Sequence, residues 1–139
     1  MTAKALSANG VRVYITGRRL EKLKEAETQH ASGGSIIGIQ MDVTSKDSIK
    51  QVVSEISSKE KCVNFLVNNA GVTSVNYGPE GQPQGDAKSV SEAMLGNQDF
   101  EDWTWPYKVD VASYYFTSAA FLPLLVAARE QCGYEQAGR

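Results

Sequence analysis

The sequence predicts an α/β fold, in which a doubly wound parallel sheet of three strands carries helices on both faces. Two observations lead to this class. Apolar, β-branched runs alternate with helical segments in the order helix, strand, helix, strand, helix, strand. The strand runs are apolar at nearly every position, which is typical of parallel strands buried on both faces. The 139 residues, 42% of them hydrophobic, suffice for one compact domain.

The chain opens with a predicted helix followed by a strand. Residues 2–8 are rich in helix formers, and Asn9 with Gly10 makes a favourable left-handed stop. The next run, 11–16, is β-branched and aromatic and is closed by Gly17, which predicts the first strand.

A surface helix and the second strand follow. Residues 20–29 place their apolar side chains on one side of a helix and their lysines and glutamates elsewhere. Glycines and serines at 32–35 break this pattern. The apolar run 36–41, which ends at Asp42, predicts the second strand.

The clearest helix of the chain precedes the third strand. Residues 44–47 have the spacing of a capping box, and an apolar stripe at helical intervals follows them. This stripe consists of Ile49, Val52, Val53 and Ile56. The apolar run 63–67 then predicts the third strand.

A loop and a long helix complete the chain. Glycine, proline, serine and glutamine dominate residues 73–102, which predicts an irregular loop with a short helix at 89–95. Apolar residues in 103–128 form a helical stripe, and Pro123 is expected to kink or end this helix near Leu122.

Charge and hydropathy argue against several classes of partner. The 16 acidic and 14 basic residues are spread along the chain, so no basic face for nucleic acid is expected. The longest strongly apolar stretch, 119–128, is far shorter than the roughly 20 residues that span a bilayer. Residues 1–8 lack the apolar core of a signal peptide. We therefore expect a cytoplasmic protein without a nucleic acid or membrane partner.

The cysteine and histidine content predicts no metal site. Cys62 and Cys132 lie far apart without a CxxC motif, and His30 is the only histidine. Ordinary reduced thiols are expected, rather than a disulfide or metal ligands.

Polar or small residues follow each predicted strand, at the edge where parallel sheets bind ligands. In chain order these residues are Arg18, Arg19, Asp42, Val43, Asn69, Ala70 and Gly71. Paired arginines can clamp a phosphate, an aspartate can accept a bond from an adenine amine, and Ala-Gly lets a ring or ribose approach the backbone. Together these residues predict an adenosine-phosphate groove.

Each of these residues also has a simpler interpretation. The two arginines can be the solvated start of a helix, and Asp42 can be a turn residue ahead of the next helix. Asn68 and Asn69 can form a turn whose side chains tie down the loop. The shared order and spacing of these residues, rather than any one of them, favour the groove.

The runs VYITGRR, MDVTS and VNNAG, followed by WTWPYKVDVASYYFTSAAFLPLL, resemble the short-chain dehydrogenase/reductase family in content and order. The resemblance implies a single Rossmann-like domain over residues 1–139 that binds NAD or NADP. It also implies hydride transfer to or from a carbonyl or hydroxyl carbon of a small molecule. Asn69, Ala70 and Gly71 would then lie under the adenosine side of the cofactor, while Asn68 holds the sheet.

Three finer expectations depend on this resemblance. NAD-preferring members usually carry an acidic residue where this chain has Gly17 and Arg18, and a guanidinium suits a 2′-phosphate, so NADP is favoured over NAD. Asp110 stands at the position of a catalytic asparagine. Its carboxylate keeps the acceptor but lacks the amide donor, and a second interpretation is an aspartate that only faces a polar groove. Family members often pair through the long helix, so residues 107–122 are a candidate homo-oligomer interface.

The resemblance also indicates parts that this sequence lacks. No GxGxxG or GxxxGxG turn precedes the first helix, and none of the six tyrosines has a lysine four residues later. The catalytic serine, tyrosine and lysine of the family are therefore missing. We expect an incomplete domain, inactive alone, whose sheet has a central gap between strands 11–16 and 63–67.

The sequence leaves three functions open. The first is part of an NADP-dependent oxidoreductase. The second is a non-catalytic nucleotide-binding or interaction fragment that pairs with another chain. The third is an unrelated Rossmann-like binding protein, in which the three matching strand ends are coincidental.

Overall fold

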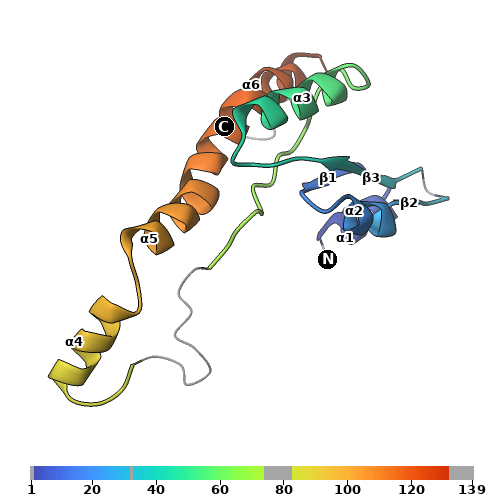
Figure 1. The fold of residues 1–139 in the computed structure, drawn as a ribbon. Helices are drawn as coiled ribbons and strands as arrows, with labels where there is room; N and C mark the ends of the chain where they lie inside the picture. Colours follow the sequence, from blue (N-terminus) through green and yellow to red (C-terminus); the bar gives the residue numbers. More distant parts are fainter. Residues whose placement is uncertain (1, 32, 74–82, 132–139) are drawn as a thin grey trace, which may run out of the picture.

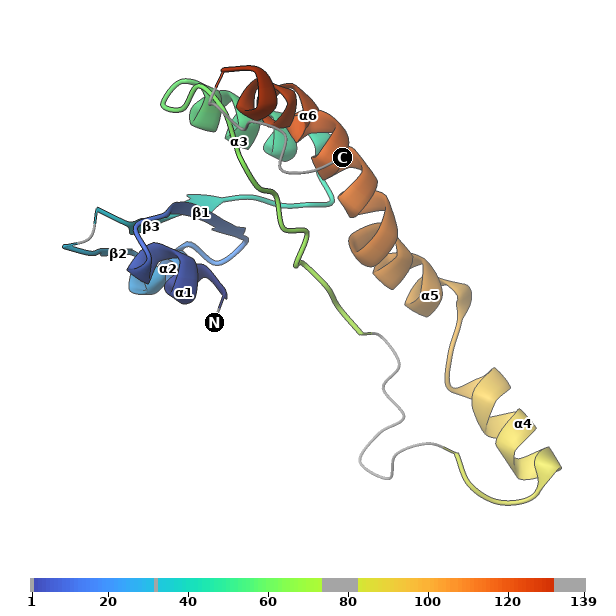
Figure 2. The ribbon, with the colours of Figure 1, turned by 180° about the vertical axis from the view of Figure 1, so that it is seen from behind.

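The computed structural model describes residues 2–31, 33–73 and 83–131. It confirms the α/β class, because a three-stranded sheet carries helices on both faces (Figure 1). Helices α1 (Thr2–Ala8) and α2 (Leu20–Ala26) cover one face. Helices α3 (Lys46–Ser57) and α6 (Ser113–Gln131) lie on the other side and pack against each other (Figure 2).

The strand order of the sheet is β1-β3-β2. Strands β1 (Arg12–Gly17) and β3 (Ser35–Gln40) run parallel, as the sequence predicted. The two-residue strand β2 (Thr28–Gln29) runs antiparallel to β3. The predicted helix over 20–29 is therefore too long, because its last residues pair with β3 instead of continuing α2.

The outer edge of β3 is occupied along much of its length. Thr28 and Gln29 pair with the start of β3, and the backbone amide of Gly38 donates to Glu27 Oε1 at 3.0 Å. The carboxylate of Glu27 thus binds the amide of Gly38, which a carbonyl of a further strand would otherwise bind. In contrast, β1 has no strand on its other side among the described residues.

The predicted third strand is wrong. Residues 63–67 form no ladder, although the amide of Val63 donates to the carbonyl of Leu124 at 3.1 Å. Two side chains of this segment, Phe65 and Val67, are 72% and 52% exposed. Within the described ranges the segment pairs with no strand, β1 included, which agrees with the expected gap in the sheet.

The main core lies between the carboxyl end of β3 and the pair of helices α3 and α6. The predicted apolar stripe of α3 enters it with three residues that are each 2% exposed: Ile49, Val52 and Ile56. The other buried members are Ile39, Met41, Phe121 and Leu124. The side chain of Ser45 caps the start of α3 by accepting the amide of Ser48.

Helix α2 packs closely on β3 at a glycine. A Cβ on Gly38 would lie 2.7 Å from Cβ of Leu23, a side chain that is buried. Only a residue without a side chain lets α2 approach this closely, which explains the glycine inside an otherwise apolar strand.

The last helical segments form one long rod (Figure 1). Helix α5 (Phe100–Tyr107) continues through one stretch of π-helix, η1 (Lys108–Ala112), into α6. Pro123 lies inside α6 and does not end it, which corrects the expected end near Leu122. The core contacts of Phe121 and Leu124 hold this part of the helix on either side of the proline.

The predicted loop contains more helix than expected. The short helix predicted at 89–95 is α4 (Ala87–Gly96), which stands away from the sheet in both views (Figures 1 and 2). The predicted loop also includes the start of α5. Of the described residues, the stretch Phe100–Glu130 is long and apolar enough to cross a membrane by length and composition, a property that core helices of soluble proteins share.

One cysteine corrects the expectation of reduced thiols. Cys62 is disulfide-bonded, whereas Cys132 lies outside the described residues. Within the described ranges, no group of three or more histidine, cysteine, aspartate or glutamate side chains could hold a metal ion.

Candidate functional site

An open groove of about 1320 Å³ runs along the free edge of β1. The segment 63–72 forms its opposite wall, and side chains of the long helix, including Val109 and Tyr114, complete it. All seven residues predicted at the strand ends line this one groove: Arg18, Arg19, Asp42, Val43, Asn69, Ala70 and Gly71. The structure thus brings together what the sequence placed at three separate strand ends.

The two arginines lie where β1 passes into α2. Both side chains are exposed, and Arg19 is the N-cap residue of α2 without a side-chain capping bond. The carbonyl of Arg18 accepts a hydrogen bond from Gln40 Nε2 at 2.9 Å, which fixes the backbone beside the end of β3. The arginines therefore begin a helix and line the groove at once, so the two interpretations of the sequence are compatible.

Asp42 is held by a turn directly after β3. Its Oδ1 accepts the amide of Thr44 at 2.9 Å and the hydroxyl of Thr44 at 2.7 Å. These two hydrogen bonds lower the pKa of Asp42, and the positive charges of Arg18 and Lys108 lower it further against the effect of burial. The carboxylate is therefore ionised at neutral pH. Among the described residues no bond to Oδ2 is formed, so this oxygen can accept a ligand donor.

The long helix holds the segment 68–72 by three hydrogen bonds. Asn68 Nδ2 donates to Ser118 Oγ at 3.0 Å. The hydroxyl of Tyr114 donates to the carbonyl of Ala70 at 2.6 Å, and the amide of Val72 donates to Asp110 Oδ1 at 2.9 Å. Asn68 thus ties down the loop, as its simpler interpretation proposed.

Asp110 does not line the groove. It lies on η1 behind the segment, and one oxygen of its carboxylate binds the backbone of Val72. Sequence reasoning missed Tyr114 and Ser118 as partners of the same segment. A signal was present, because Asp110, Tyr114 and Ser118 are polar groups spaced four residues apart in an apolar helix, which places them along one face.

A polar cluster closes the amino end of the groove. Glu60 Oε1 accepts hydrogen bonds from the hydroxyl of Tyr14 at 2.8 Å and from Arg12 Nη1 at 2.6 Å. Burial, with the hydrogen bond and negative charge of Glu60, raises the pKa of Tyr14 to about 12. Burial opposes the ionisation of Glu60, but its bonds to Arg12 and Tyr14 outweigh this effect and lower its pKa. The cluster ties β1 to the chain that follows α3. Neither Tyr14 nor Glu60 changes its protonation near neutral pH, because the pKa of Tyr14 is raised and that of Glu60 is lowered.

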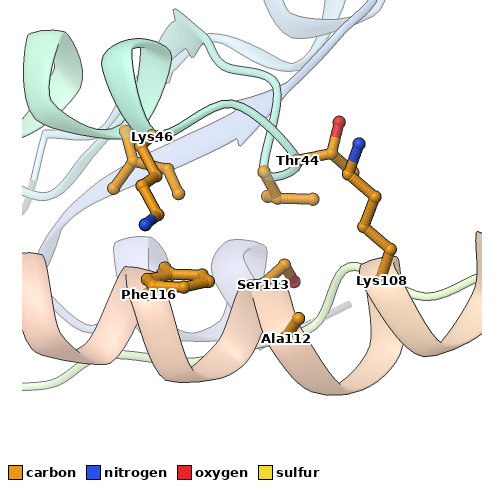
Figure 3. Close-up of a pocket in the computed structure, with 8 residues that line it drawn as sticks. Thr44, Lys46, Lys108, Ala112, Ser113 and Phe116 are labelled. Carbon is orange, nitrogen blue, oxygen red and sulfur yellow. The ribbon is translucent and has the colours of Figure 1, made fainter.

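A smaller pocket of about 190 Å³ lies between the start of α3 and the long helix (Figure 3). The ammonium group of Lys46 lies 4.1 Å from the ring centre of Phe116, a cation–π contact. Lys108 lines the opposite side near Thr44. These contacts hold the turn after Asp42 against the helix and so support the larger groove.

The donor and acceptor groups of the larger groove suit a nucleotide. Two guanidinium groups can bind phosphate oxygens, and Oδ2 of Asp42 can accept from an amino group. The small residues Ala70 and Gly71 let a flat ring or a ribose approach the backbone. These groups therefore fit a dinucleotide of the NAD(P) type on chemical grounds.

The structure is an α/β fold with an open groove along the edge of β1 that is lined by all seven residues predicted at the strand ends. Residues 1–133 match the family described as short chain dehydrogenase. The chain therefore belongs to the short-chain dehydrogenase/reductase family, and the third function left open by the sequence, an unrelated binding protein, is excluded.

Named relatives and a solved structure support this family assignment. The chain is 39% identical over 128 residues to the short-chain dehydrogenase/reductase VdtF of Byssochlamys spectabilis, covering 90% of this chain and 41% of that protein. It is 36% identical over 133 residues to PhomF′ of Diaporthe leptostromiformis, covering 94% of this chain and 44% of that protein. A metagenomic short-chain oxidoreductase in complex with NADP superposes with a TM-score of 0.68 at 28% identity, covering 91% of this chain and 51% of that one.

Proposed function

We propose that residues 1–139 form part of one Rossmann-type domain that binds NADP in an oxidoreductase. The enzyme would transfer hydride between the nicotinamide and a carbonyl or hydroxyl carbon of a small molecule. The observation that carries the proposal is that all seven residues predicted at the strand ends line one groove. The chain spans less than half the length of the curated relatives named above, so the activity of the whole protein belongs to this proposal.

The residues of this chain supply binding and orientation. Arg18 and Arg19 would hold the adenosine phosphates, Asp42 the adenine amine, and the backbone from Asn69 to Gly71 the ribose. When bound, the cofactor supplies the hydride. Asp110 holds the segment 68–72 through the amide of Val72. We propose it as a structural support rather than a proton donor, because an ionised carboxylate can accept hydrogen bonds but cannot donate them. We propose that this chain alone is inactive, because none of its tyrosines precedes a lysine by four residues.

The preference for NADP is tested by 2′,5′-ADP and 5′-AMP binding to the purified chain, measured by calorimetry. Arg18→Ala should weaken binding of 2′,5′-ADP about tenfold while changing 5′-AMP binding little, because hydrogen bonds to a charged group are worth about 1.5–3 kcal/mol. Arg129→Ala, which removes an exposed arginine at the far end of α6, is the matched control. Equal affinity of the unaltered chain for both ligands would refute the NADP preference.

A second candidate function is favoured by the free edge of β1. Between this edge and the segment 63–72 the groove is lined by residues of β1 and of the segment, including the exposed Phe65 and Val67. An extended apolar strand from another chain could pair there by backbone hydrogen bonds. Slower hydrogen exchange at β1 in a complex with a partner chain, with no nucleotide binding by that complex, would favour this function over the first.

We also propose that the protein forms a homo-oligomer through residues 107–122. Apolar and aromatic side chains on the outer face of the helix support this interface, and Tyr115, Tyr107 and Leu122 are 71%, 64% and 57% exposed. Tyr115→Ser should convert a dimer into a monomer in sedimentation velocity experiments. A monomeric unaltered chain at high concentration would refute the interface for this chain.

A further inference from the structure

The contacts between segment 68–72 and the long helix follow two matching repeats. Bonds form at every second residue of the segment and at every fourth residue of the helix, in opposite chain directions. Two residues of extended chain advance by about 6.6 Å. Four residues of α-helix advance by about 6 Å, so the two repeats stay in step between the contacts of Tyr114 and Ser118.

The middle contact is the shortest of the three. The hydroxyl of Tyr114 lies 2.6 Å from the carbonyl oxygen of Ala70, and its ring lines the groove. The flanking contact at Asp110 begins in the π-helical turn η1, and such turns occur often at functional sites. The helix therefore forms hydrogen bonds with the segment at Ala70 and on both sides of it.

Alternation in the segment determines which backbone groups remain for a ligand. In extended chain, neighbouring residues direct their amide and carbonyl groups to opposite edges. Ala70 and Val72 each bind the long helix through one backbone group, and the residues between and before them, Gly71 and Asn69, line the groove. A rotation of the segment would therefore change which of its groups face the groove.

We propose that Tyr114 is a positioning residue for the nucleotide groove. By anchoring the carbonyl of Ala70, it fixes the rotation of the segment and turns the backbone of Asn69 and Gly71 toward the ligand. Tyr114 acts through the segment, and its hydroxyl is engaged with the protein backbone. This inference rests on the nucleotide groove proposed above.

The test compares Tyr114→Phe with Tyr115→Phe in the full 139-residue chain. Each variant removes one hydroxyl, but Tyr115 is 71% exposed and its ring contacts Phe116 on the outer face of the helix. Hydrogen exchange of the peptide that covers residues 69–72 is measured first. Tyr114→Phe should exchange about twofold to tenfold faster there than the unaltered chain, since each net hydrogen bond contributes about 0.5–1.5 kcal/mol. Tyr115→Phe should leave the exchange unchanged.

Affinity for 2′,5′-ADP is the second measurement. Tyr114→Phe should weaken it about threefold to tenfold, the loss expected for one hydrogen bond that orders a binding segment. Unchanged exchange in Tyr114→Phe would overturn the inference. An unaltered chain that does not bind 2′,5′-ADP would overturn the proposed nucleotide groove for this chain, whereas the exchange result would still decide the role of Tyr114 in holding the segment.

A second variant covers the case in which Tyr114→Phe does not fold. Ser118→Ala removes the acceptor of Asn68 Nδ2, the neighbouring contact on the same helix face. If the helix sets the rotation of the segment, the exchange at residues 68–70 should rise in Ser118→Ala, with the circular dichroism of the chain unchanged. Exchange equal to that of the unaltered chain would overturn the inference.

Discussion

At the scale of single residues, Asp110 shows that a carboxylate can take over the hydrogen-bond acceptor role of an amide side chain. The family position implied an asparagine, which can both accept and donate. Asp110 keeps the acceptor role, because its Oδ1 binds the amide of Val72. Among the described residues, this is the hydrogen bond by which the Asp110 side chain holds the segment.

The loss of stability on replacement of Asp110 should therefore depend on whether an acceptor oxygen remains, rather than on the charge. Asp110→Ala should lower the free energy of unfolding by about 1–2 kcal/mol, the cost of leaving the Val72 amide without its charged partner. Asp110→Asn should cost less than half of this, because it retains an oxygen at the same place. Urea unfolding at neutral pH measures both values. Equal losses in the two variants would show that the charge is the important property.

Asp42 should give the protein a component of acid-sensitive stability. Its pKa is lowered in the folded chain by the two bonds from Thr44, so the carboxylate contributes stability that is fully present above the ordinary aspartate value of about 3.9. This contribution is lost as the pH falls through the lowered pKa. In Asp42→Asn, urea unfolding between pH 5 and 2.5 should show a smaller decrease than in the unaltered chain. Parallel curves would contradict this assignment.

At the scale of elements, close packing of helix on strand depends on Gly38. A side chain at this position would meet Leu23 at 2.7 Å from Cβ to Cβ, and the backbone carbon and oxygen of Leu23 would lie 3.2 and 3.3 Å away. Gly96, at the end of α4, has nothing within 4 Å of the same added carbon. The two glycines therefore provide a matched comparison of crowded and open positions.

Gly38→Ala should lower the free energy of unfolding by about 1–3 kcal/mol, as expected for overpacking of a well-packed contact. Gly96→Ala should change it by less than about 0.5 kcal/mol, because the added methyl group meets solvent. Denaturation by urea, followed by circular dichroism, distinguishes the two. A loss in Gly96→Ala as large as that in Gly38→Ala would show that backbone flexibility, not crowding, explains the effect.

Local patterns made most of the elements predictable. The apolar stripe of α3 and the apolar, β-branched runs that formed β1 and β3 depend on neighbouring residues, so both could be predicted from the sequence. The residues at the strand ends could also be predicted to meet, since parallel strands end at one edge. Elements that depend on distant partners could not. The strand β2 exists only through its pairing with β3, and residues 63–67 have strand composition without a ladder partner.

At the scale of the whole molecule, the apolar residues are divided between a packed core and an open wall. Phe121 lies in the core at 4% exposure, whereas Phe65 lies on the groove wall at 72%. The same residue type therefore has two different roles in one chain. This difference leads to a direct comparison of stability.

Phe121→Ala should lower the free energy of unfolding by about 3–5 kcal/mol, because it leaves a cavity among tightly packed side chains. Phe65→Ala should change it by less than about 0.5 kcal/mol and should reduce the binding of a hydrophobic dye. Urea unfolding and dye fluorescence measure the two effects. A large stability loss in Phe65→Ala would show that the groove wall is packed in solution.

The carboxylate of Glu27 and the short strand β2 have a consequence for how this sheet can be enlarged. They cover the outer edge of β3, whereas the edge of β1 on the opposite side is free. Among the described residues, the edge of β1 beside the groove is therefore the longest open position at which a further strand could pair. Any such addition would narrow the groove as it extended the sheet, so completion of the β-structure and shaping of the ligand site are a single event.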